Sequence, residues 1–276
     1  MSLDAAQPVT RTVEVRGARV GFSEFGGEGP DVLLVHGSRA HRGWWHGVAE
    51  ALHGHRVRAM DLTGHGSSDH RPAYEIGTWV EEIVAVAADR RPLLVGHSLG
   101  GRAALTAAAA RPAAFAGLVL VDAPIRPPRA YLENRRTATT RPPRTTVPHH
   151  PTKEAAFARF RLFPEQPMPT AEVMARLAAH SVRSTPHGWT WSHDQLGEFP
   201  DLYSGEAEQA LRRCFVPLTY VYGGRSGLMT EEEAQWVAAN HAGPTRLVRV
   251  AGGYHHLPLD SPRECADAIR DALRSE

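Results

Sequence analysis

"LLVGHSLGG", residues 93–101, joins an aliphatic run to an alanine-rich stretch through the pattern G-x-S-x-G. Between a strand and a helix, this pattern indicates a sharp turn that exposes a nucleophilic serine. Gly96 and Gly100 leave room for the turn, and Ser98 then lies at a helix N-terminus, where unpaired N–H groups favour a developing oxyanion. An ordinary turn whose serine only caps the helix is the competing interpretation. Motif and context together predict a nucleophile at Ser98.

The chain around this turn alternates short aliphatic runs with longer helical patterns, which predicts βαβ crossovers and a mostly parallel sheet. We expect strands at 31–36, 57–60, 92–96, 118–122, 218–222 and 246–250, and helices around 44–52, 75–88, 99–110, 230–241 and 263–273. An alternating stretch that turns at Gly17 precedes them and predicts an antiparallel hairpin at one edge. The expected fold class is therefore α/β, with a doubly wound sheet.

One connection is far longer than the usual few residues between a helix or strand and the next strand. It begins after Asp122 with a run rich in proline and arginine and continues with helical patterns at about 153–163, 170–182 and 206–213. We therefore expect a core domain at 1–122 and 216–276, with an inserted helical cap or lid at 123–215.

The first part of this insertion is strongly basic. Residues 123–163 hold nine Lys or Arg against two acidic residues. Such an excess could attract an anionic substrate or an acyl-carrier partner. A solvated segment is the simpler interpretation, because the rest of the chain balances the charge. The role of the arginine-rich segment 126–144 stays open.

Four ordered motifs resemble the α/β-hydrolase superfamily, in its serine esterase-like branch with a helical cap. They are "LLVHGS" at 33–38, "DLTGHGSSD" at 61–69, "VGHSLGG" at 95–101 and "GGYHHLPLDSP" at 252–262. The resemblance implies an oxyanion hole formed by the backbone N–H groups of Ser38 and Leu99. It also implies structural rather than catalytic roles for His36, Asp61, His65 and Asp69.

A serine hydroxyl near neutral pH needs a positioned base, which is usually a histidine. The resemblance implies that this base lies after the last strand, where the sequence offers His255 and His256. Similar sequences place the histidine seven residues before the proline that opens the final helix. His255 has this spacing to Pro262 and is the preferred base, and His256 is the alternative.

The third group must orient the imidazole, and a carboxylate is expected. Members of the superfamily most often carry it in the turn after the strand at 218–222, but here that turn is "GGRSG", without an acid. Parallel strands bring their C-terminal ends to one edge of the sheet, so Asp122 at the end of "LVLVD" is the predicted substitute. The order nucleophile, acid, histidine is then preserved.

Other arrangements of the acid stay open. Asp122 could be a plain turn former that leads into the cap. The next candidates are Asp260, Glu231 and Glu232, although Glu232 would lie inside a helix. A protein without an orienting acid would be a slow enzyme or a receptor.

Substrate contacts are expected from the cap and from the loop at 38–47. The candidates are Trp44, His97, Trp189 and Trp191, although packing is the simpler interpretation for most cap aromatics and for His97. Trp44 and Trp45 cannot both face the same way, so one should pack in the core. The pair His149 and His150 has no spaced set of partners, so we expect no metal site there.

Composition narrows the function further. A net charge of +1 gives no reason to expect nucleic acid or an anionic membrane as partner, and no run approaches the length of a membrane span. Cys214 and Cys265 form no CxxC pair and the N-terminus lacks a signal-like apolar run, which together favour the cytoplasm.

The predicted function is hydrolysis of an ester, thioester or related small acyl substrate through an acyl-enzyme on Ser98, a mechanism that needs no cofactor. Two alternatives use the same scaffold. One is a hydrolase-like ligand-binding receptor, and the other is a cofactor-free non-hydrolytic enzyme such as a lyase, perhydrolase or oxygenase.

Overall fold

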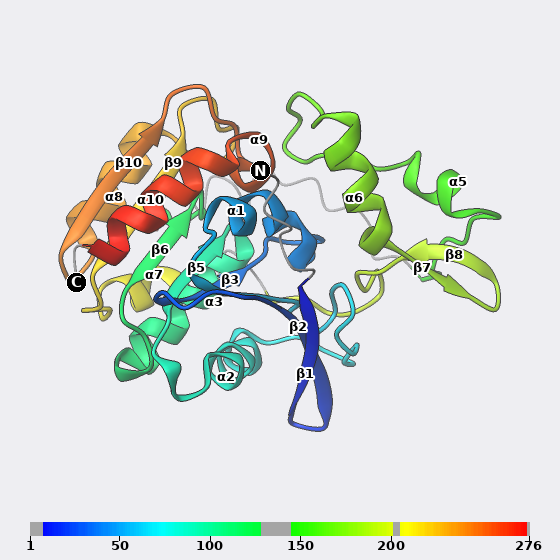
Figure 1. Cartoon of the computed structure of the whole chain (residues 1–276), viewed down its shortest axis with the longest axis horizontal. Helices are drawn as coiled ribbons and strands as arrows, with labels where there is room; N and C mark the ends of the chain where they lie inside the picture. Colours follow the sequence, from blue (N-terminus) through cyan, green and yellow to red (C-terminus); the bar gives the residue numbers. More distant parts are fainter. Residues whose placement is uncertain (1–7, 128–144, 201–204, 275–276) are drawn as a thin grey trace.

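The computed structural model describes residues 8–127, 145–200 and 205–274, and its main feature is an eight-stranded sheet (Figure 1). In spatial order the strands are β1 (Val9–Val15), β2 (Ala18–Phe25), β4 (Arg56–Met60), β3 (Asp31–Val35), β5 (Leu93–His97), β6 (Leu118–Val121), β9 (Leu218–Gly223) and β10 (Thr245–Val250). β1 and β2 form the antiparallel hairpin, and β2 pairs antiparallel with β4. The remaining pairs are parallel, so the predicted fold class is confirmed.

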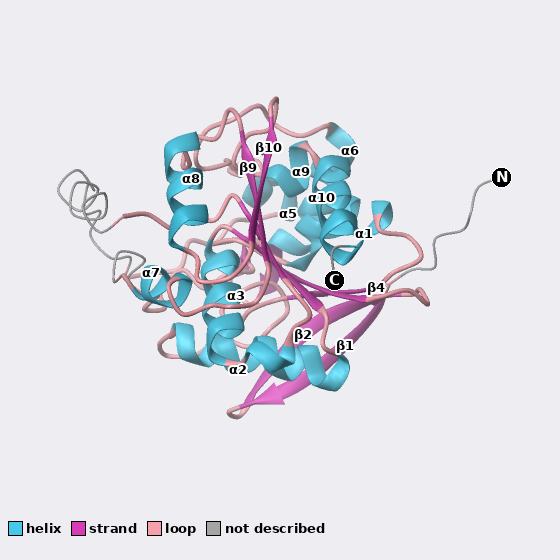
Figure 2. Ribbon diagram, turned by 90° about the vertical axis from the view of Figure 1, so that its left-hand side faces the viewer, coloured by secondary structure: helices cyan, strands magenta, loops and turns pink. Residues whose placement is uncertain are grey.

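Helices cover both faces of this sheet (Figure 2). One face carries α1 (His46–Ala51) and α10 (Pro262–Arg274), and the other carries α2 (Ile76–Ala87), α3 (Leu99–Ala110), α7 (Glu206–Leu211) and α8 (Glu231–Asn240). Short elements complete the core: η1 (Arg42–Trp45), η2 (Ala88–Arg90), η3 (Pro112–Ala114) and α9 (Leu257–Asp260).

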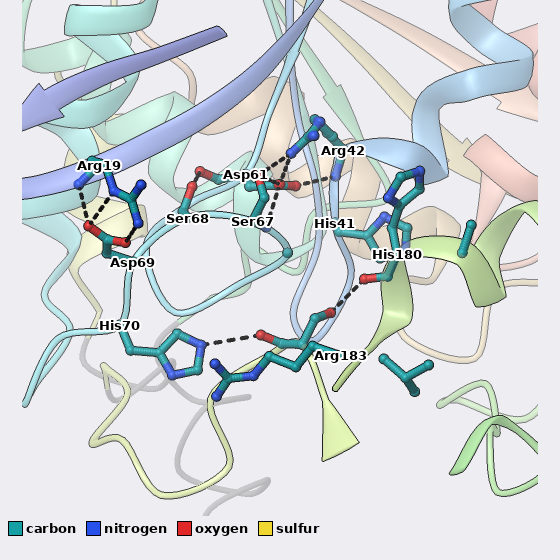
Figure 3. A pocket seen from close by; sticks show the side chains of 14 residues that line it. Arg19, His41, Arg42, Asp61, Ser67, Ser68, Asp69, His70, His180 and Arg183 are labelled. Carbon is teal, nitrogen blue, oxygen red and sulfur yellow. Dashed lines mark hydrogen bonds and ion pairs between the residues drawn. The ribbon is translucent and has the colours of Figure 1, made fainter. Parts of the chain in front are cut away.

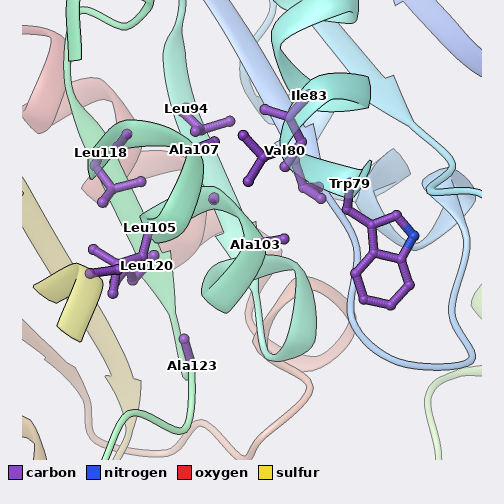
Figure 4. Close-up of a cluster of buried hydrophobic side chains, with 14 of the residues drawn as sticks. Trp79, Val80, Ile83, Leu94, Ala103, Leu105, Ala107, Leu118, Leu120 and Ala123 are labelled. Carbon is purple, nitrogen blue, oxygen red and sulfur yellow. The ribbon is translucent and has the colours of Figure 1, made fainter. Parts of the chain in front are cut away.

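The two hydrophobic layers follow from the alternation of side chains along each strand. In β3, Leu33 and Val35 belong to the cluster under α2 and α3, whereas Val32 and Leu34 face α1 and α10. Figure 4 shows part of the first cluster, where α2 and α3 pack on β5 and β6. Since both faces are buried, the parallel strands read as continuous apolar runs in the sequence.

The inserted segment is less helical than predicted. It contains α5 (Lys153–Phe157), α6 (Ala171–Ser181) and a hairpin of β7 (Val182–Thr185) and β8 (Gly188–Trp191), which lie together beyond one end of the sheet (Figure 1). The helix expected at 153–163 ends at Phe157, and the hairpin was not expected. Valine, threonine and tryptophan around a Pro-His-Gly turn favour strands, a signal that the sequence carries at 182–191.

The helix α7 packs on α3 rather than on the cap elements. Its Ala207, Ala210 and Leu211 are buried in the core cluster. The division into a core and a cap at 123–215 stays a prediction, and the cap so defined includes a helix that packs with the core.

Two further expectations concern the arginine-rich segment and the absence of a membrane span. Most of the arginine-rich segment 126–144 lies outside the described residues, although Arg126 forms an ion pair with Glu233 at 2.8 Å. Among the helices that the structure describes, none combines the length and the apolar character that crossing a membrane requires.

The close approach of α3 to β3 yields a stability prediction. A Cβ on Gly100 would lie 2.2 Å from the carbonyl oxygen of His36, whereas a Cβ on Gly77 in α2 would meet no atom within 4 Å. We expect Gly100→Ala to lower the free energy of unfolding by about 2 kcal/mol or more, because backbone must move. Gly77→Ala, the matched control, should leave it unchanged or raise it by about 0.5 kcal/mol. Urea unfolding with equal midpoints for both variants would contradict this account.

Candidate active site

Ser98 lies at the sharp turn between β5 and α3. Its backbone has φ 53° and ψ −119°, a region that residues other than glycine rarely adopt. The chain can turn there because glycines allow close contact: a Cβ on Gly96 would lie 2.5 Å from the carbonyl oxygen of Gly100. The turn thereby places Ser98 just beyond the carboxyl end of β5, an internal strand.

The structure brings Ser98, His255 and Asp122 together. Nδ1 of His255 lies 2.7 Å from Oδ2 of Asp122, and its Nε2 lies 3.1 Å from Oγ of Ser98. Asp122 follows β6 with φ 45° and is fully buried, and His255 is 2% exposed. A carboxylate accepts hydrogen bonds, so the N–H on Nδ1 donates to Asp122 and the lone pair of Nε2 faces the serine hydroxyl. The arrangement can remove a proton from Ser98.

The turn after β9 has no acidic residue, but it forms hydrogen bonds with the carboxylate of Asp122. The hydroxyl of Ser226 donates to Oδ2 of Asp122 at 2.6 Å, and the backbone N–H of Gly223 donates to Oδ1 at 2.9 Å. The same hydroxyl accepts the N–H groups of Leu228 and Met229, both at 3.1 Å. Sequence reasoning missed Ser226. The signal was available, because a serine in the turn beside Asp122 stands where parallel strand ends meet.

The residues predicted to form an oxyanion hole lie beside Ser98. A Cβ on Gly37 would lie 3.1 Å from Cβ of Ser98, which places the loop that contains Ser38 against the serine. Leu99 is the first residue of α3. Among the described residues, neither the Ser38 nor the Leu99 backbone N–H has an acceptor, so both can donate to a developing oxyanion.

Two further histidines surround the base. Nε2–H of His97 donates to the carbonyl oxygen of His255 at 3.0 Å, and His97 is buried. This location favours the packed interpretation of His97 over a role in substrate binding. His256 is also buried, and burial lowers its pKa to about 3, so its imidazole is neutral near pH 7. Burial likewise lowers the pKa of His97 well below its usual value.

The hydrogen bonds of His255 distinguish it from His256, the alternative base, and distinguish Asp122 from the alternative acids. No described partner forms a hydrogen bond with either ring nitrogen of His256, although the Phe163 carbonyl is near enough to favour the protonated ring. The carboxylate of Asp260 bonds the backbone N–H of Tyr254 and the side chain of Gln166 rather than His255. Glu231 and Glu232 are exposed on α8.

The residues interpreted as structural are bonded away from Ser98. His36 bridges the carbonyl of Gly37 and the N–H of Leu62. Asp61 pairs with Arg42 and Asp69 pairs with Arg19 at 3.0 Å. Nδ1 of His65 lies 3.3 Å from the carbonyl oxygen of Thr63.

Those ion pairs line a cavity of about 520 Å³ between the loop at 61–70 and the cap elements α6 and β7 (Figure 3). Its lining includes His41, His180 and Arg183 but none of Ser98, Asp122 and His255. The cavity therefore lies between the loop 61–70 and the inserted segment, and it does not contain the side chains of Ser98, Asp122 and His255.

The predicted aromatic candidates lie in different places. Trp45 is fully buried in the core, whereas Trp44 packs on cap Phe160 and on His256, with ring centroids 6.3 and 5.3 Å apart. Trp191 also contacts Phe160, at 6.3 Å. Trp189 lies in β8, where its backbone pairs with His150. Trp44 thus contacts His256, the residue next to the predicted base.

The described residues contain one histidine group that could hold a metal ion. His97, His255 and His256 each offer a ring nitrogen, and these nitrogens lie within 4.8 Å of one another. Imidazoles suit zinc and copper. An ion bound there would take the lone pair of His255 that faces Ser98, so it would oppose proton removal rather than assist it.

Comparison with known proteins places this fold and site in a family. The model of the alpha/beta hydrolase family matches residues 32–268. The chain therefore belongs to the alpha/beta hydrolase family, and the resemblance noted in the sequence is confirmed.

Several relatives carry functional names. Esterase Rv0045c of Mycobacterium tuberculosis is 28% identical over 279 residues, which cover 96% of this chain and 90% of that protein. The pimeloyl-[acyl-carrier protein] methyl ester esterase of Aeromonas salmonicida is 35% identical over 97 residues, 34% of this chain and 38% of that protein. A solved thioesterase domain from the curacin biosynthetic pathway aligns with a TM-score of 0.77 and 27% identity, over 96% of this chain and 99% of that one.

Buried His41 generates a prediction about acid stability. Its Nδ1 accepts the N–H of Gly43 and its Nε2–H donates to Ser181, each at 3.1 Å, and burial lowers its pKa to about 3. Between pH 6.5 and about 3 the unfolded chain binds this proton and the folded chain does not. Stability therefore falls as pH falls, by up to about 1.4 kcal/mol per pH unit for this residue.

Urea unfolding between pH 7.5 and 4.5 tests whether His41 contributes to the loss of stability as pH falls. His41→Gln should lose less stability than wild type over that range, whereas the exposed control His53→Gln should follow wild type. Parallel curves for His41→Gln and wild type would show that His41 does not set this slope.

Proposed function

We propose that the protein is a serine hydrolase that cleaves a carboxylic ester, thioester or related small acyl substrate through an acyl-enzyme on Ser98. The observation that carries this proposal is the hydrogen-bonded series Ser98, His255, Asp122, with distances of 3.1 and 2.7 Å. Such a series activates a hydroxyl that is otherwise a weak nucleophile. The names of the esterase and thioesterase relatives give independent support for an acyl substrate.

In the first half of the reaction, the proton of the Ser98 hydroxyl passes to Nε2 of His255 as Oγ attacks the acyl carbon. The N–H groups of Ser38 and Leu99 stabilise the oxyanion of the tetrahedral intermediate. The carbon–heteroatom bond of the leaving group then breaks, and His255 returns the proton to that group. Asp122 holds the imidazole in the required tautomer and stabilises its charged form.

In the second half, His255 removes a proton from water, whose oxygen attacks the acyl carbon. The ester bond to Ser98 breaks, His255 returns the proton to Oγ, and the carboxylic acid leaves. This step separates hydrolysis from non-hydrolytic chemistry on the same scaffold. Turnover in ¹⁸O-labelled water should place one label in the acid product.

A fluorophosphonate probe followed by intact mass spectrometry tests the nucleophile and the acid. We expect one adduct on wild type, mapped to Ser98, and none on Ser98→Ala. Asp122→Asn should label about 10³–10⁴-fold more slowly, because loss of the orienting acid has an effect of this size in the serine-protease template. Equal labelling of Asp122→Asn and wild type would move the acid elsewhere, and an unlabelled wild type would refute the mechanism.

The support from Ser226 gives a second prediction. Ser226→Ala removes one donor from the buried carboxylate of Asp122, and hydrogen bonds to charged groups contribute about 1.5–3 kcal/mol. We expect kcat/KM for a p-nitrophenyl ester to fall by about tenfold or more. Ser226→Thr keeps the hydroxyl and should retain most of the activity. The same loss in both variants would indicate that the turn, rather than the hydroxyl, matters.

A further inference from the structure

Gln166, in the cap segment between α5 and α6, bonds the loop that carries the base. Its Oε1 accepts the backbone N–H of His256 at 3.0 Å, and its Nε2 donates to Oδ2 of Asp260 at 3.0 Å. Both ends of the carboxamide are therefore used. A neutral side chain with one acceptor and one donor in a fork is what this pair of partners requires.

These bonds and one more hold the residues on both sides of His255 in the sequence. Oδ2 of Asp260 also accepts the N–H of Tyr254 at 3.1 Å, and the N–H of Asp260 donates to the carbonyl of His256 at 3.1 Å. The residue before the base and the residue after it are thus both tied to the pair formed by Gln166 and Asp260. The carbonyl oxygen of His255 itself accepts a hydrogen bond from His97.

The same cap segment contacts the turn that supports the acid. A Cβ on Gly227 would lie 3.1 Å from Cβ of Pro164, so this proline packs directly on the turn. The neighbouring Ser226 is the residue that donates to Asp122. Two residues apart along the cap segment, Pro164 and Gln166 therefore contact the acid's turn and the base's loop.

We propose that Gln166 is a positioning residue, which holds the loop 254–260 so that His255 reaches Ser98 and Asp122 together. This inference rests on the proposed function. Within the described residues, Gln166 forms no hydrogen bond with Ser98, His255 or Asp122, and it acts through the His256 backbone and the Asp260 side chain. Because it belongs to the inserted segment, the seating of that segment on the core sets the geometry of the base.

Removal of the amide is the first test. Gln166→Ala should lower kcat for a small p-nitrophenyl ester by about tenfold and change KM little, since its two hydrogen bonds position the base rather than bind substrate. The matched control is Glu165→Ala, at an exposed neighbour that makes no hydrogen bond or ion pair within the described residues. A change in KM alone, or equal effects of both variants, would overturn the proposal.

A charge exchange gives a sharper readout. Gln166→Glu keeps the acceptor for His256 but places a second carboxylate against Asp260, and such a pair raises the pKa of one member. The activity of this variant relative to wild type should therefore rise as pH falls, when a shared proton restores the donor. Glu165→Gln, the control at the exposed neighbour, leaves Asp260 unchanged, so its activity ratio to wild type should stay flat over the same pH range. A ratio independent of pH in Gln166→Glu would refute the role.

Hydrogen exchange followed by mass spectrometry separates this inference from the proposed function. The amides of Tyr254 and His256 should exchange faster in Gln166→Ala than in wild type and in Glu165→Ala, whether or not the protein hydrolyses esters. Faster exchange without fluorophosphonate labelling of wild type would keep the contact and reject the mechanism. Unchanged exchange, with normal labelling, would reject the positioning role alone.

Discussion

The hydrogen bond between Asp122 and His255 is the constraint on which the site depends, because it requires a buried carboxylate at the end of an internal strand. Such a group is costly to bury unless donors surround it. The donors come from the neighbouring strand: β6 and β9 are in register at Val121 and Val221, so the chain after β9 passes directly beside Asp122. Gly223 and Ser226 provide the N–H and hydroxyl there. The turn "GGRSG" therefore lacks an acid but provides the two donors that stabilise the carboxylate at the end of the neighbouring strand.

The close packing around Ser98 is a second constraint. Gly101 leaves no space for a Cβ, which would lie 2.5 Å from Cβ of Ala123, the residue after the acid. The helix that follows the nucleophile and the strand end that carries the acid therefore touch. A larger residue at position 101 would clash with Ala123, so this glycine of "GHSLGG" allows the close contact between α3 and the chain after β6.

The sequence was sufficient for those parts of the molecule that follow from period and from the geometry of parallel sheets. Continuous apolar runs indicated buried strands, and the alignment of strand ends placed Asp122 beside the loop of His255, where the structure has it. The hairpin β7–β8 was missed because its two four-residue strands are too short for a clear alternation. The packed position of His97 was predicted, but its partner and the contacts of Gln166 were not, because these bonds join residues that are 90 or more positions apart in the chain. No local pattern encodes such a contact.

Asp122 and His255, the proposed acid and base, are supported in different ways, and the difference bears on how the inserted segment would influence the proposed chemistry. The two donors to Asp122 other than His255 belong to β9 and its turn, within the core that the sheet holds together. The loop 254–260 bonds the core through the His255 ring, which contacts Asp122 and Ser98, and through His97 and Arg225. It bonds the inserted segment through Gln166, at the N–H of His256 and the carboxylate of Asp260. A shift of the inserted segment would therefore act on the loop of His255 through Gln166 and on the turn beside Asp122 through Pro164. In the proposed mechanism, proton transfer from Ser98 depends on the 3.1 Å contact with Nε2 of His255, so such a shift would slow the reaction without any change in the sheet.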